Sequence, residues 1–236
     1  ASNLGSGADR DGRIAINIGT SAAVRVIENG ARGRFPLGLF RYVVDAKRTL
    51  LGGAISNGGN LRRWSLRELR VEDDQVLSRR ASATDLLDVL PFWVQERSPT
   101  WPEDIAGTVT GFTQSTTATE LLRALTVSTF YRLAEILDLV APKKGMEREV
   151  IVSGGILKSP PLVRILADAI GRDLQVSRVL ESSIRGAAIH ALEQLGAEVP
   201  PLRRGKIVKH SPALAEQHLL RRERQRALEE LLSRQR

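Results

Sequence analysis

The sequence contains no cysteine, and aromatic residues make up only 4% of its 236 positions. A chain without cysteine has neither a disulfide framework nor a thiolate metal site. No apolar run approaches the roughly 20 residues of a membrane-spanning helix, and no charged-then-apolar signal segment opens the chain. Together these absences favour a cytoplasmic protein with no membrane partner.

The basic charge of the chain suggests a nucleic-acid partner, but the distribution of that charge argues against one. The formal net charge is +8 and the pI is about 10.5. Clustered Lys and Arg gain affinity for phosphates by releasing counterions. Much of the excess lies in residues 202–236, where Arg alternates with Glu in a helical pattern, and few aromatic side chains are available for base stacking. We therefore expect a solvated basic helix face there and no nucleic-acid function.

The pattern of apolar residues predicts one α/β domain with a sizeable core, since 42% of the 236 residues are hydrophobic. The first quarter, residues 13–55, consists of short alternating runs separated by glycine-rich turns, which is typical of β-strands. A helix is expected over 58–69. Residues 73–113 combine a short helical piece with proline-broken loop and predict an irregular excursion over the core.

The second half alternates between helical and strand patterns. Thr117 and Glu120 form a capping box before an apolar stripe that predicts a helix to Val140. A strand (149–155), a helix (159–171), a strand (173–177) and a helix (182–196) follow, and Gly171 and Gly196 stand where C′ glycines belong. This order predicts one mixed sheet with flanking helices. In the last of these helices, the small residues 186–188 indicate close contact between helix and sheet.

Four glycine-centred turns stand out as candidate binding elements: NLGSG, NIGTSA, LGGAISNGGNLRRW and VSGGILKSP. Gly19-Thr20-Ser21 joins two strand patterns without the Asn-Gly or Asp-Gly typical of a purely structural hairpin turn. Glycine permits close approach of main chain, and the neighbouring hydroxyls and N–H groups suit a phosphate. Gly154 and Gly155 follow a buried strand, at the end where α/β sheets bind ligands. Neither the P-loop nor the dinucleotide fingerprint is present.

Taken in order, five segments resemble the C-terminal domain of the FGGY family of carbohydrate kinases. They are INIGTSAAVRV, LGGAISNGGNLRRW, LPFWVQERSPTWPEDIAGTVTGFT, LLRALTVSTFYRLAEIL and the stretch from VIVSGGILKSP to HALEQLG. The segments IGTSAAVRV, FPLGLFRYVVD and GGAISNGGN are most similar to the gluconokinase branch, and xylulose kinases come next. The resemblance implies an actin-like ATPase (ribonuclease H-like) fold and the use of ATP with Mg²⁺.

The resemblance also assigns site residues. It implies that the ATP phosphates are held by Gly19, Thr20 and Ser21, and that the adenosine is lined by Gly59, Arg63, Gly154, Gly155, Ile156 and Ser159. Related proteins often carry Asn at the position of Ser159 and Gln at that of Arg63. The Arg63 side chain either stacks on the base or lies in solvent, and both alternatives stay open.

Residues 1–236 are expected to be the nucleotide-binding C-terminal domain, with the N-terminal sugar-binding domain outside this chain. The resemblance places the general-base Asp about three positions before Ala1, so no catalytic residue is predicted here. Asp9 and Asp11 are interpreted as loop residues, and Glu96 receives no catalytic role. His190, His210 and His218 do not form a metal-ligand cluster, and no metal site is predicted.

The function predicted for the intact protein is ATP-dependent phosphorylation of a sugar or sugar acid, with a gluconate-like substrate favoured. The isolated chain is expected to bind nucleotide weakly and to transfer no phosphate. A xylulose kinase is one alternative. A non-catalytic, actin-like nucleotide-binding scaffold is the other.

Overall fold

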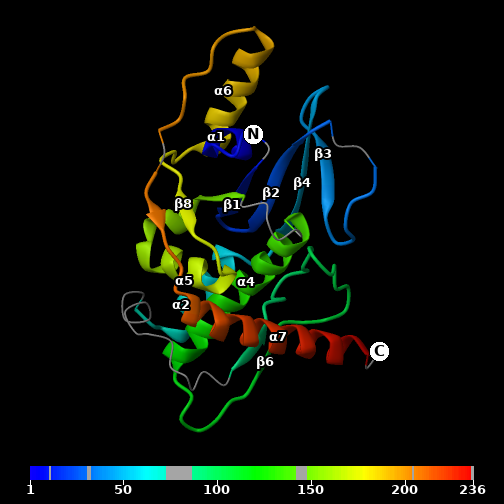
Figure 1. Cartoon of the computed structure of the whole chain (residues 1–236). Coiled ribbons are helices and arrows are strands. Elements are labelled where there is room, and N and C mark those ends of the chain that lie inside the picture. Colours follow the sequence, from blue (N-terminus) through cyan, green and yellow to red (C-terminus); the bar gives the residue numbers. More distant parts are fainter. Residues whose placement is uncertain (11, 31–32, 73–86, 142–147, 204, 235–236) are drawn as a thin grey trace.

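The computed structural model describes residues 1–10, 12–30, 33–72, 87–141, 148–203 and 205–234. Within these residues the centre of the molecule is a seven-stranded mixed sheet in the order β3-β4-β2-β1-β7-β8-β9 (Figure 1). Helices lie against this sheet, and the predicted mixed sheet with flanking helices is confirmed.

The antiparallel half of the sheet comes from the first quarter of the chain. Its strands are β1 (Arg13–Ile18), β2 (Ala22–Asn29), β3 (Phe40–Val43) and β4 (Arg48–Ile55). β2 pairs with both β1 and β4, and Ile18 lies opposite Ala22, so residues 19–21 form the hairpin turn. The apolar alternation predicted this block correctly, because one side chain in two faces the core.

The parallel half of the sheet brings a distant part of the chain beside β1. β7 (Glu149–Ser153) runs parallel to β1, β8 (Leu174–Val176) runs parallel to β7, and β9 (Ile207–Val208) closes the edge in the antiparallel direction. Asn17 lies opposite Ser153, and its Nδ2 donates to the Ser153 hydroxyl at 3.0 Å. The carboxyl ends of β1 and β7 therefore meet at one edge of the sheet.

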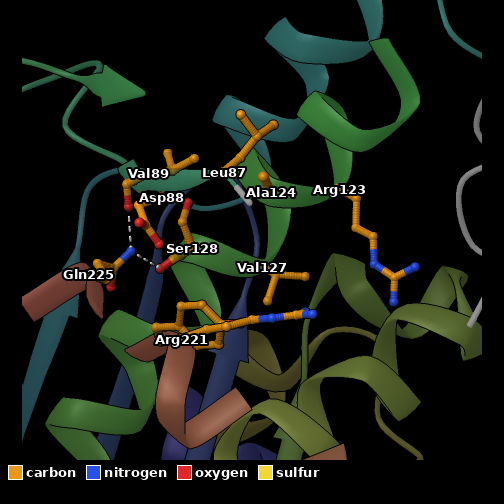
Figure 2. A pocket seen from close by; sticks show the side chains of 10 residues that line it. Leu87, Asp88, Val89, Arg123, Ala124, Val127, Ser128, Arg221 and Gln225 are labelled. Atoms are coloured by element: carbon orange, nitrogen blue, oxygen red, sulfur yellow. Dashed lines mark hydrogen bonds between the residues drawn. The ribbon is translucent and has the colours of Figure 1, made fainter. Parts of the chain in front are cut away.

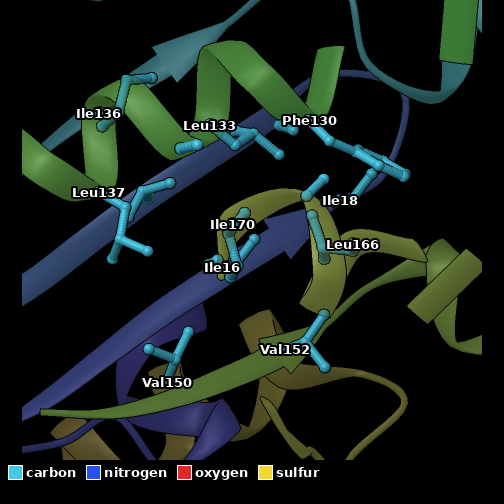
Figure 3. Packing of buried hydrophobic residues seen from close by; sticks show 14 of the residues in the cluster. Ile16, Ile18, Phe130, Leu133, Ile136, Leu137, Val150, Val152, Leu166 and Ile170 are labelled. Atoms are coloured by element: carbon cyan, nitrogen blue, oxygen red, sulfur yellow. The ribbon is translucent and has the colours of Figure 1, made fainter. Parts of the chain in front are cut away.

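The main core lies between this sheet and the helix α4 (Ala118–Val140). The capping box predicted for α4 is present: the Glu120 amide donates to the Thr117 hydroxyl at 3.2 Å, and the Thr117 amide donates to the Glu120 carboxylate at 2.7 Å. Figure 3 shows the packing, in which α4 and α5 (Pro160–Ile170) meet strands β1 and β7 through apolar side chains: Ile16, Ile18, Phe130, Leu133, Ile136, Leu137, Val150, Val152, Leu166 and Ile170.

The opening segment differs from its prediction as a glycine turn. Residues Ser2–Ser6 form the short helix α1, which ends at Gly7 in a left-handed conformation with φ 99°. α1 packs on α6 (Ser182–Gln194), where a Cβ added to Gly186 would stand 1.8 Å from the Ala1 carbonyl oxygen. Gly186 thus serves a contact between two helices, whereas Ala187 and Ala188 are exposed, and the expected helix–sheet contact was wrong.

The excursion after α2 (Gly59–Leu69) contains a second, two-stranded sheet. β5 (Asp88–Leu90) and β6 (Thr108–Thr110) pair in the antiparallel direction. A short helical piece was predicted within 73–113; the described part of that segment, residues 87–113, contains no helix, and residues 73–86 lie outside the described residues, as does Asp11. Asp9 forms an ion pair with Arg13 at 3.2 Å, consistent with its interpretation as a loop residue.

The basic C-terminal helix α7 (Pro212–Arg234) is more than a solvated face. It crosses the molecule beside α4 and α5 (Figure 1), and His218, Gln225 and Glu229 are buried beneath it. The Gln225 amide donates to the main-chain oxygens of Val89 and Ser128 at 2.6 and 3.2 Å. The sequence did not predict this contact face, because it is polar and α7 lacks the apolar stripe by which a buried helix face is recognised.

Candidate functional site

The β1–β2 turn is attached to the start of α2 through main chain alone. The Gly59 amide donates to the Gly19 oxygen at 2.9 Å, and the Asn60 amide donates to the Thr20 oxygen at 3.0 Å. A Cβ added to Gly59 would lie 2.5 Å from that Gly19 oxygen, so only glycine permits this approach. The turn thus satisfies N–H groups that the first turn of a helix leaves without intrahelical partners.

Glu96 stabilises the segment that leads into α2. Its buried carboxylate accepts hydrogen bonds from the Ser56 amide at 2.5 Å and from the Asn57 side-chain amide at 2.9 Å. Asn57 in turn donates to the Val94 oxygen at 2.9 Å. These bonds give Glu96 a structural role, consistent with the absence of any catalytic assignment to it.

A second glycine corner follows β7 and touches the end of β1. Gly154 has a φ of 93°, and a Cβ there would lie 2.5 Å from the Ile18 oxygen. The chain then forms the 3-10 helix η1 (Gly155–Lys158) and enters α5 through Ser159, which stands at the N-cap position but makes no side-chain cap bond. The two corners are therefore in direct main-chain contact, with η1 and α5 on one side and α2 on the other.

A cavity of about 480 Å³ opens where these elements meet. Seven of the nine residues that the sequence assigned to a nucleotide site line it. They are Gly19, Thr20, Gly59, Arg63, Gly155, Ile156 and Ser159. Ser21 and Gly154 do not line it: Ser21 is exposed at the start of β2, and Gly154 packs against Ile18.

The rear wall of the cavity was missed at the level of sequence. Thr126, Thr129 and Phe130 of α4 contribute to it, together with Arg62 of α2. The Arg62 Nη1 donates to the Thr126 hydroxyl at 3.0 Å, and that hydroxyl donates to the Leu122 oxygen at 2.8 Å. Two threonines three residues apart within an otherwise apolar helical stripe were the available signal, because they indicate a polar patch on a buried face.

The charge of the cavity wall is positive. Arg62, Arg63 and Lys158 line the cavity, and no carboxylate is found among the described residues of its lining. Arg62 is buried, while Arg63 and Lys158 are exposed to solvent. A concave site with bare main chain, hydroxyls and cations is suited to an anionic ligand that has a flat apolar part.

Another cavity, beneath α7, is too small for such a ligand. It measures about 30 Å³ and lies among side chains of α4, α7 and the segment around β5 (Figure 2). Gln225 reaches into this region with its two main-chain hydrogen bonds. A space of this size holds about one water molecule.

Two of the three histidines, His210 and His218, have hydrogen-bond partners within the fold. His210 Nδ1 lies 2.7 Å from the Asp173 carboxylate, and the Tyr131 hydroxyl is hydrogen-bonded to His218 Nδ1 at 2.9 Å. Among the described residues, no three His, Cys, Asp or Glu side chains gather as metal ligands. Over the same part of the chain, no helix combines the length and apolar character needed to cross a membrane.

Comparison with known proteins gives consistent results. A model of the C-terminal domain of the FGGY family of carbohydrate kinases matches residues 14–194. The gluconokinase of Bacillus subtilis (strain 168) is 30% identical over 215 residues, which is 83% of this chain and 41% of that protein. A glycerol kinase of Xanthomonas euvesicatoria is 29% identical over 143 residues, covering 58% of this chain and 29% of its own length.

Solved structures show the same fold. A ligand-bound xylulose kinase from Lactobacillus acidophilus superimposes with a TM-score of 0.87 at 22% identity, over 98% of this chain and 50% of that one. The gluconate kinase from Lactobacillus acidophilus gives a TM-score of 0.86 at 22% identity, over 98% of this chain and 49% of that one. The chain thus spans half or less of the length of these proteins.

Proposed function

This chain belongs to the FGGY family of carbohydrate kinases, and on that basis we propose that it is the nucleotide-binding C-terminal domain of a kinase that uses ATP to phosphorylate a sugar or sugar acid. In this proposal the sugar-binding domain lies outside residues 1–236. A gluconate-like substrate is favoured, because the match to a gluconokinase extends over 83% of the chain and that to a glycerol kinase over 58%.

The observation that carries the proposal is the cavity between the two glycine corners. Its volume of about 480 Å³ falls within the range of roughly 300–1,000 Å³ typical of small-molecule sites. The hairpin turn lies on its wall together with Gly155 and Ser159, although about 135 residues separate them in sequence. A nucleotide bound there would reach both elements at once.

Each wall has a role in this proposal. Thr20 would bind phosphate through its hydroxyl and its main-chain N–H, and Gly19, whose own amide donates to the Ser21 oxygen at 2.9 Å, leaves room for it on the wall. The exposed hydroxyl of Ser21 would bind phosphate from outside the cavity lining. Gly155 and Ile156 present bare main chain and an apolar side chain to the base, with Gly154 shaping the corner beneath them. Gly59, Arg63 and Ser159 complete the nucleoside side. The chain's part is to hold the phosphates; Mg²⁺ bound together with ATP would neutralise charge on the phosphate oxygens.

In this proposal the proton acceptor for the sugar hydroxyl comes from outside the cavity, since the part of its lining that the structure describes holds no carboxylate. We expect it to be the Asp that the family resemblance places shortly before Ala1. A general base contributes about 10²–10⁴-fold to rate, and orientation of the reactants contributes effective molarities of roughly 10⁵–10⁸ M. The isolated chain should therefore bind nucleotide and transfer no phosphate.

The test compares residues 1–236 with the intact gene product. Both are titrated with Mg²⁺-ADP and assayed for ATP-dependent phosphorylation of gluconate, xylulose and glycerol. We expect nucleotide binding by both, turnover by the intact protein alone, and the highest kcat/KM with gluconate. The highest kcat/KM with xylulose would identify the xylulose kinase alternative, and nucleotide binding without turnover on any sugar would identify a scaffold. Turnover by the isolated chain would contradict the proposed division of roles.

A further inference from the structure

The face of the sheet opposite α4 carries a half-buried arginine, Arg25 of β2. Side chains alternate along this strand, so Val24 and Val26 enter the main core, whereas Arg25 lies on the other face, where Ile27 packs against α1 and α6. In the part of the chain that the structure describes, the Arg25 guanidinium makes no hydrogen bond and no ion pair. Its charge is therefore available to a ligand.

Gly52 provides the space that the Arg25 side chain occupies. The two residues lie opposite each other on β4 and β2, and a Cβ added to Gly52 would stand 2.8 Å from the Arg25 Cγ. The stem of Arg25 thus lies against the bare main chain of β4, an approach that a residue with a side chain would obstruct. The fold accommodates an arginine at this position although the arginine has no partner there.

A second cation adds to the positive charge on this face. Arg97 is attached to the end of β4, where its guanidinium donates to the Ser56 hydroxyl at 3.1 Å. Burial, and to a smaller extent the charge of Arg97, lowers the pKa of Arg25. A cation that has lost part of its hydration beside another cation gains from an anionic partner. The charges on this face therefore favour an anion.

A cavity of about 470 Å³ opens beside Arg25, between the start of α1, β3 and α6. His190 and Tyr42 line it as well, and the buried Nδ1 atom of His190 has no hydrogen-bond partner among the described residues. The described lining holds no carboxylate, and Glu193, one turn beyond His190 on α6, is paired with Arg48 at 2.5 Å. The cavity thus offers an anion one cation and two side chains that can donate hydrogen bonds.

The same cavity lies beside the place where the proposed function puts the reacting hydroxyl. Ala1 is part of its lining, and the general-base Asp is expected shortly before Ala1. A stretch of about three residues spans at most about 10 Å, which is comparable with the length of an extended six-carbon sugar acid. Such a substrate can place its terminal hydroxyl at the Asp and its carboxylate beside Arg25.

We propose that Arg25, together with His190 and Tyr42, binds the carboxylate of a sugar acid, and that the protein acts on aldonic acids in preference to neutral sugars. The inference rests on the proposed function, because it assumes that the intact protein is a sugar kinase whose general base precedes Ala1. It gives the C-terminal domain a part in substrate recognition besides nucleotide binding. A guanidinium matches the two oxygens of a carboxylate with two parallel hydrogen bonds, an arrangement that a neutral hydroxyl does not reproduce.

The experiment measures kcat/KM of the intact gene product for gluconate and for gluconamide, in which a neutral amide replaces the carboxylate and the rest of the molecule is unchanged. Arg25→Gln removes the proposed cation, and His190→Phe keeps a ring but removes its nitrogen atoms. Arg67→Gln is the matched control, because Arg67 is an exposed arginine of α2 outside this cavity. Circular dichroism and the dissociation constant for Mg²⁺-ADP show whether each variant keeps its fold and its nucleotide site.

We expect the wild type to prefer gluconate over gluconamide at least tenfold. Arg25→Gln should lower kcat/KM for gluconate about 10–100-fold and that for gluconamide less than threefold, because a hydrogen bond between charged groups is lost only with gluconate. His190→Phe should reduce the preference about threefold. Arg67→Gln should leave both values unchanged.

Three results would contradict the inference. If the wild type uses gluconamide within threefold of gluconate, or phosphorylates neutral sugars alone, the inference is wrong and the proposed kinase function stands. If Arg25→Gln lowers kcat/KM equally for both compounds, Arg25 pairs with a carboxylate of the protein outside residues 1–236, and its assignment to the substrate is wrong. If the intact protein phosphorylates no sugar or sugar acid, the proposed function fails together with the inference.

Discussion

Gly154 is the residue on which the contact between the two glycine corners depends. Its φ of 93° is a conformation that side chains with a Cβ rarely adopt, and the space a Cβ would need is filled by the Ile18 oxygen 2.5 Å away. Gly155 differs although it is adjacent: its nearest neighbour to an added Cβ is the same oxygen at 3.7 Å, an ordinary contact. The fold therefore requires glycine at position 154, whereas position 155 has room for a Cβ.

Replacing Gly154 by alanine should destabilise the fold, whereas the same change at Gly155 should not. We expect Gly154→Ala to lower the free energy of unfolding by about 2–4 kcal/mol, because backbone strain and a main-chain clash add. Gly155→Ala should change it by less than about 1 kcal/mol. Urea unfolding followed by circular dichroism measures both, and equal losses at the two positions would contradict the assigned geometry.

His218 is a titratable side chain held neutral inside the fold. It lies on the buried face of α7 and is hydrogen-bonded to the Tyr131 hydroxyl at 2.9 Å. Burial, with smaller contributions from Arg221 and Arg123, lowers the pKa of His218 from 6.5 to about 4. Between these two pH values the unfolded chain binds a proton that the folded chain does not, so the free energy of unfolding falls as the pH falls.

The pH dependence of stability should therefore contain a His218 component. Lowering the pH from 7 to about 4 should cost about 3 kcal/mol through this residue. His218→Asn keeps an acceptor for the Tyr131 hydroxyl and removes the titration, so its stability should fall less steeply over the same range. Urea titrations at several pH values measure the difference, with His210→Asn as the control. Parallel pH profiles for wild type and His218→Asn would rule out this role.

At the level of elements, α7 is attached to α4 through a buried cluster of charged and polar groups. Arg132 of α4 is fully buried, and its guanidinium contacts the carboxylates of Glu135 at 2.9 Å and of Glu229 at 2.5 Å. It also donates to the Thr100 hydroxyl at 2.7 Å. Removing one partner from such a cluster leaves a buried charge without full compensation, which costs more than the pair gains in isolation.

Glu229→Gln should therefore weaken the fold while keeping the shape of the side chain. We expect a loss of about 3 kcal/mol in the free energy of unfolding. Glu230→Gln is the control, because Glu230 is largely exposed and its nearest cationic atom, on Arg234, lies 3.9 Å away; exposed pairs contribute about 1 kcal/mol or less. Denaturant unfolding of the two variants tests the contrast, and a loss below 1 kcal/mol for Glu229→Gln would show that this cluster does not attach α7.

For the molecule as a whole, the charge of +8 overstates the free positive surface of α7. Several arginines of this helix form ion pairs with acidic residues of the domain: Arg222 with Asp138 at 2.9 Å, Arg224 with Asp88 at 2.7 Å and Arg226 with Glu135 at 3.3 Å. Binding to nucleic acid would require these cations to exchange a protein carboxylate for a phosphate. The gain from counterion release is then partly lost.

We expect no specific retention of the chain on DNA. Its elution volume in size-exclusion chromatography at about 50 mM salt should be unchanged by a duplex of 20–30 base pairs, because Arg222, Arg224 and Arg226 are already paired with carboxylates. A basic DNA-binding domain of similar net charge provides the positive control. A shift that disappears as salt is raised would contradict the prediction and reopen the nucleic-acid alternative.

Elements fixed by contacts between residues close in sequence were predicted correctly, whereas those fixed by contacts between distant residues were not. The β1–β2 hairpin and α4 were predicted because local alternation and a capping box determine them within a few residues. The opening SNLGS segment was misread because a five-residue helix has too little periodicity of its own, and its contact with α6 lies about 180 residues away. The polar underside of α7 was missed for a related reason, since Gln225 and Glu229 look like surface residues until their partners are known.

The sequence alone determined the order of most strands and helices, the family, and most of the glycine-rich wall of the candidate site. These features depend on patterns of a few neighbouring residues, which can be recognised in the sequence without the structure. Only the tertiary structure decided that Gly154 packs on Ile18, that Thr126 and Arg62 form the rear of the cavity, and that Arg63 and Lys158 line it from different elements. The contact of Gly154 with Ile18 follows from the parallel pairing of β1 with β7, which joins residues 136 apart, and the bond between Arg62 and Thr126 joins α2 to α4 across 64 residues. Such separations leave no local pattern in the sequence.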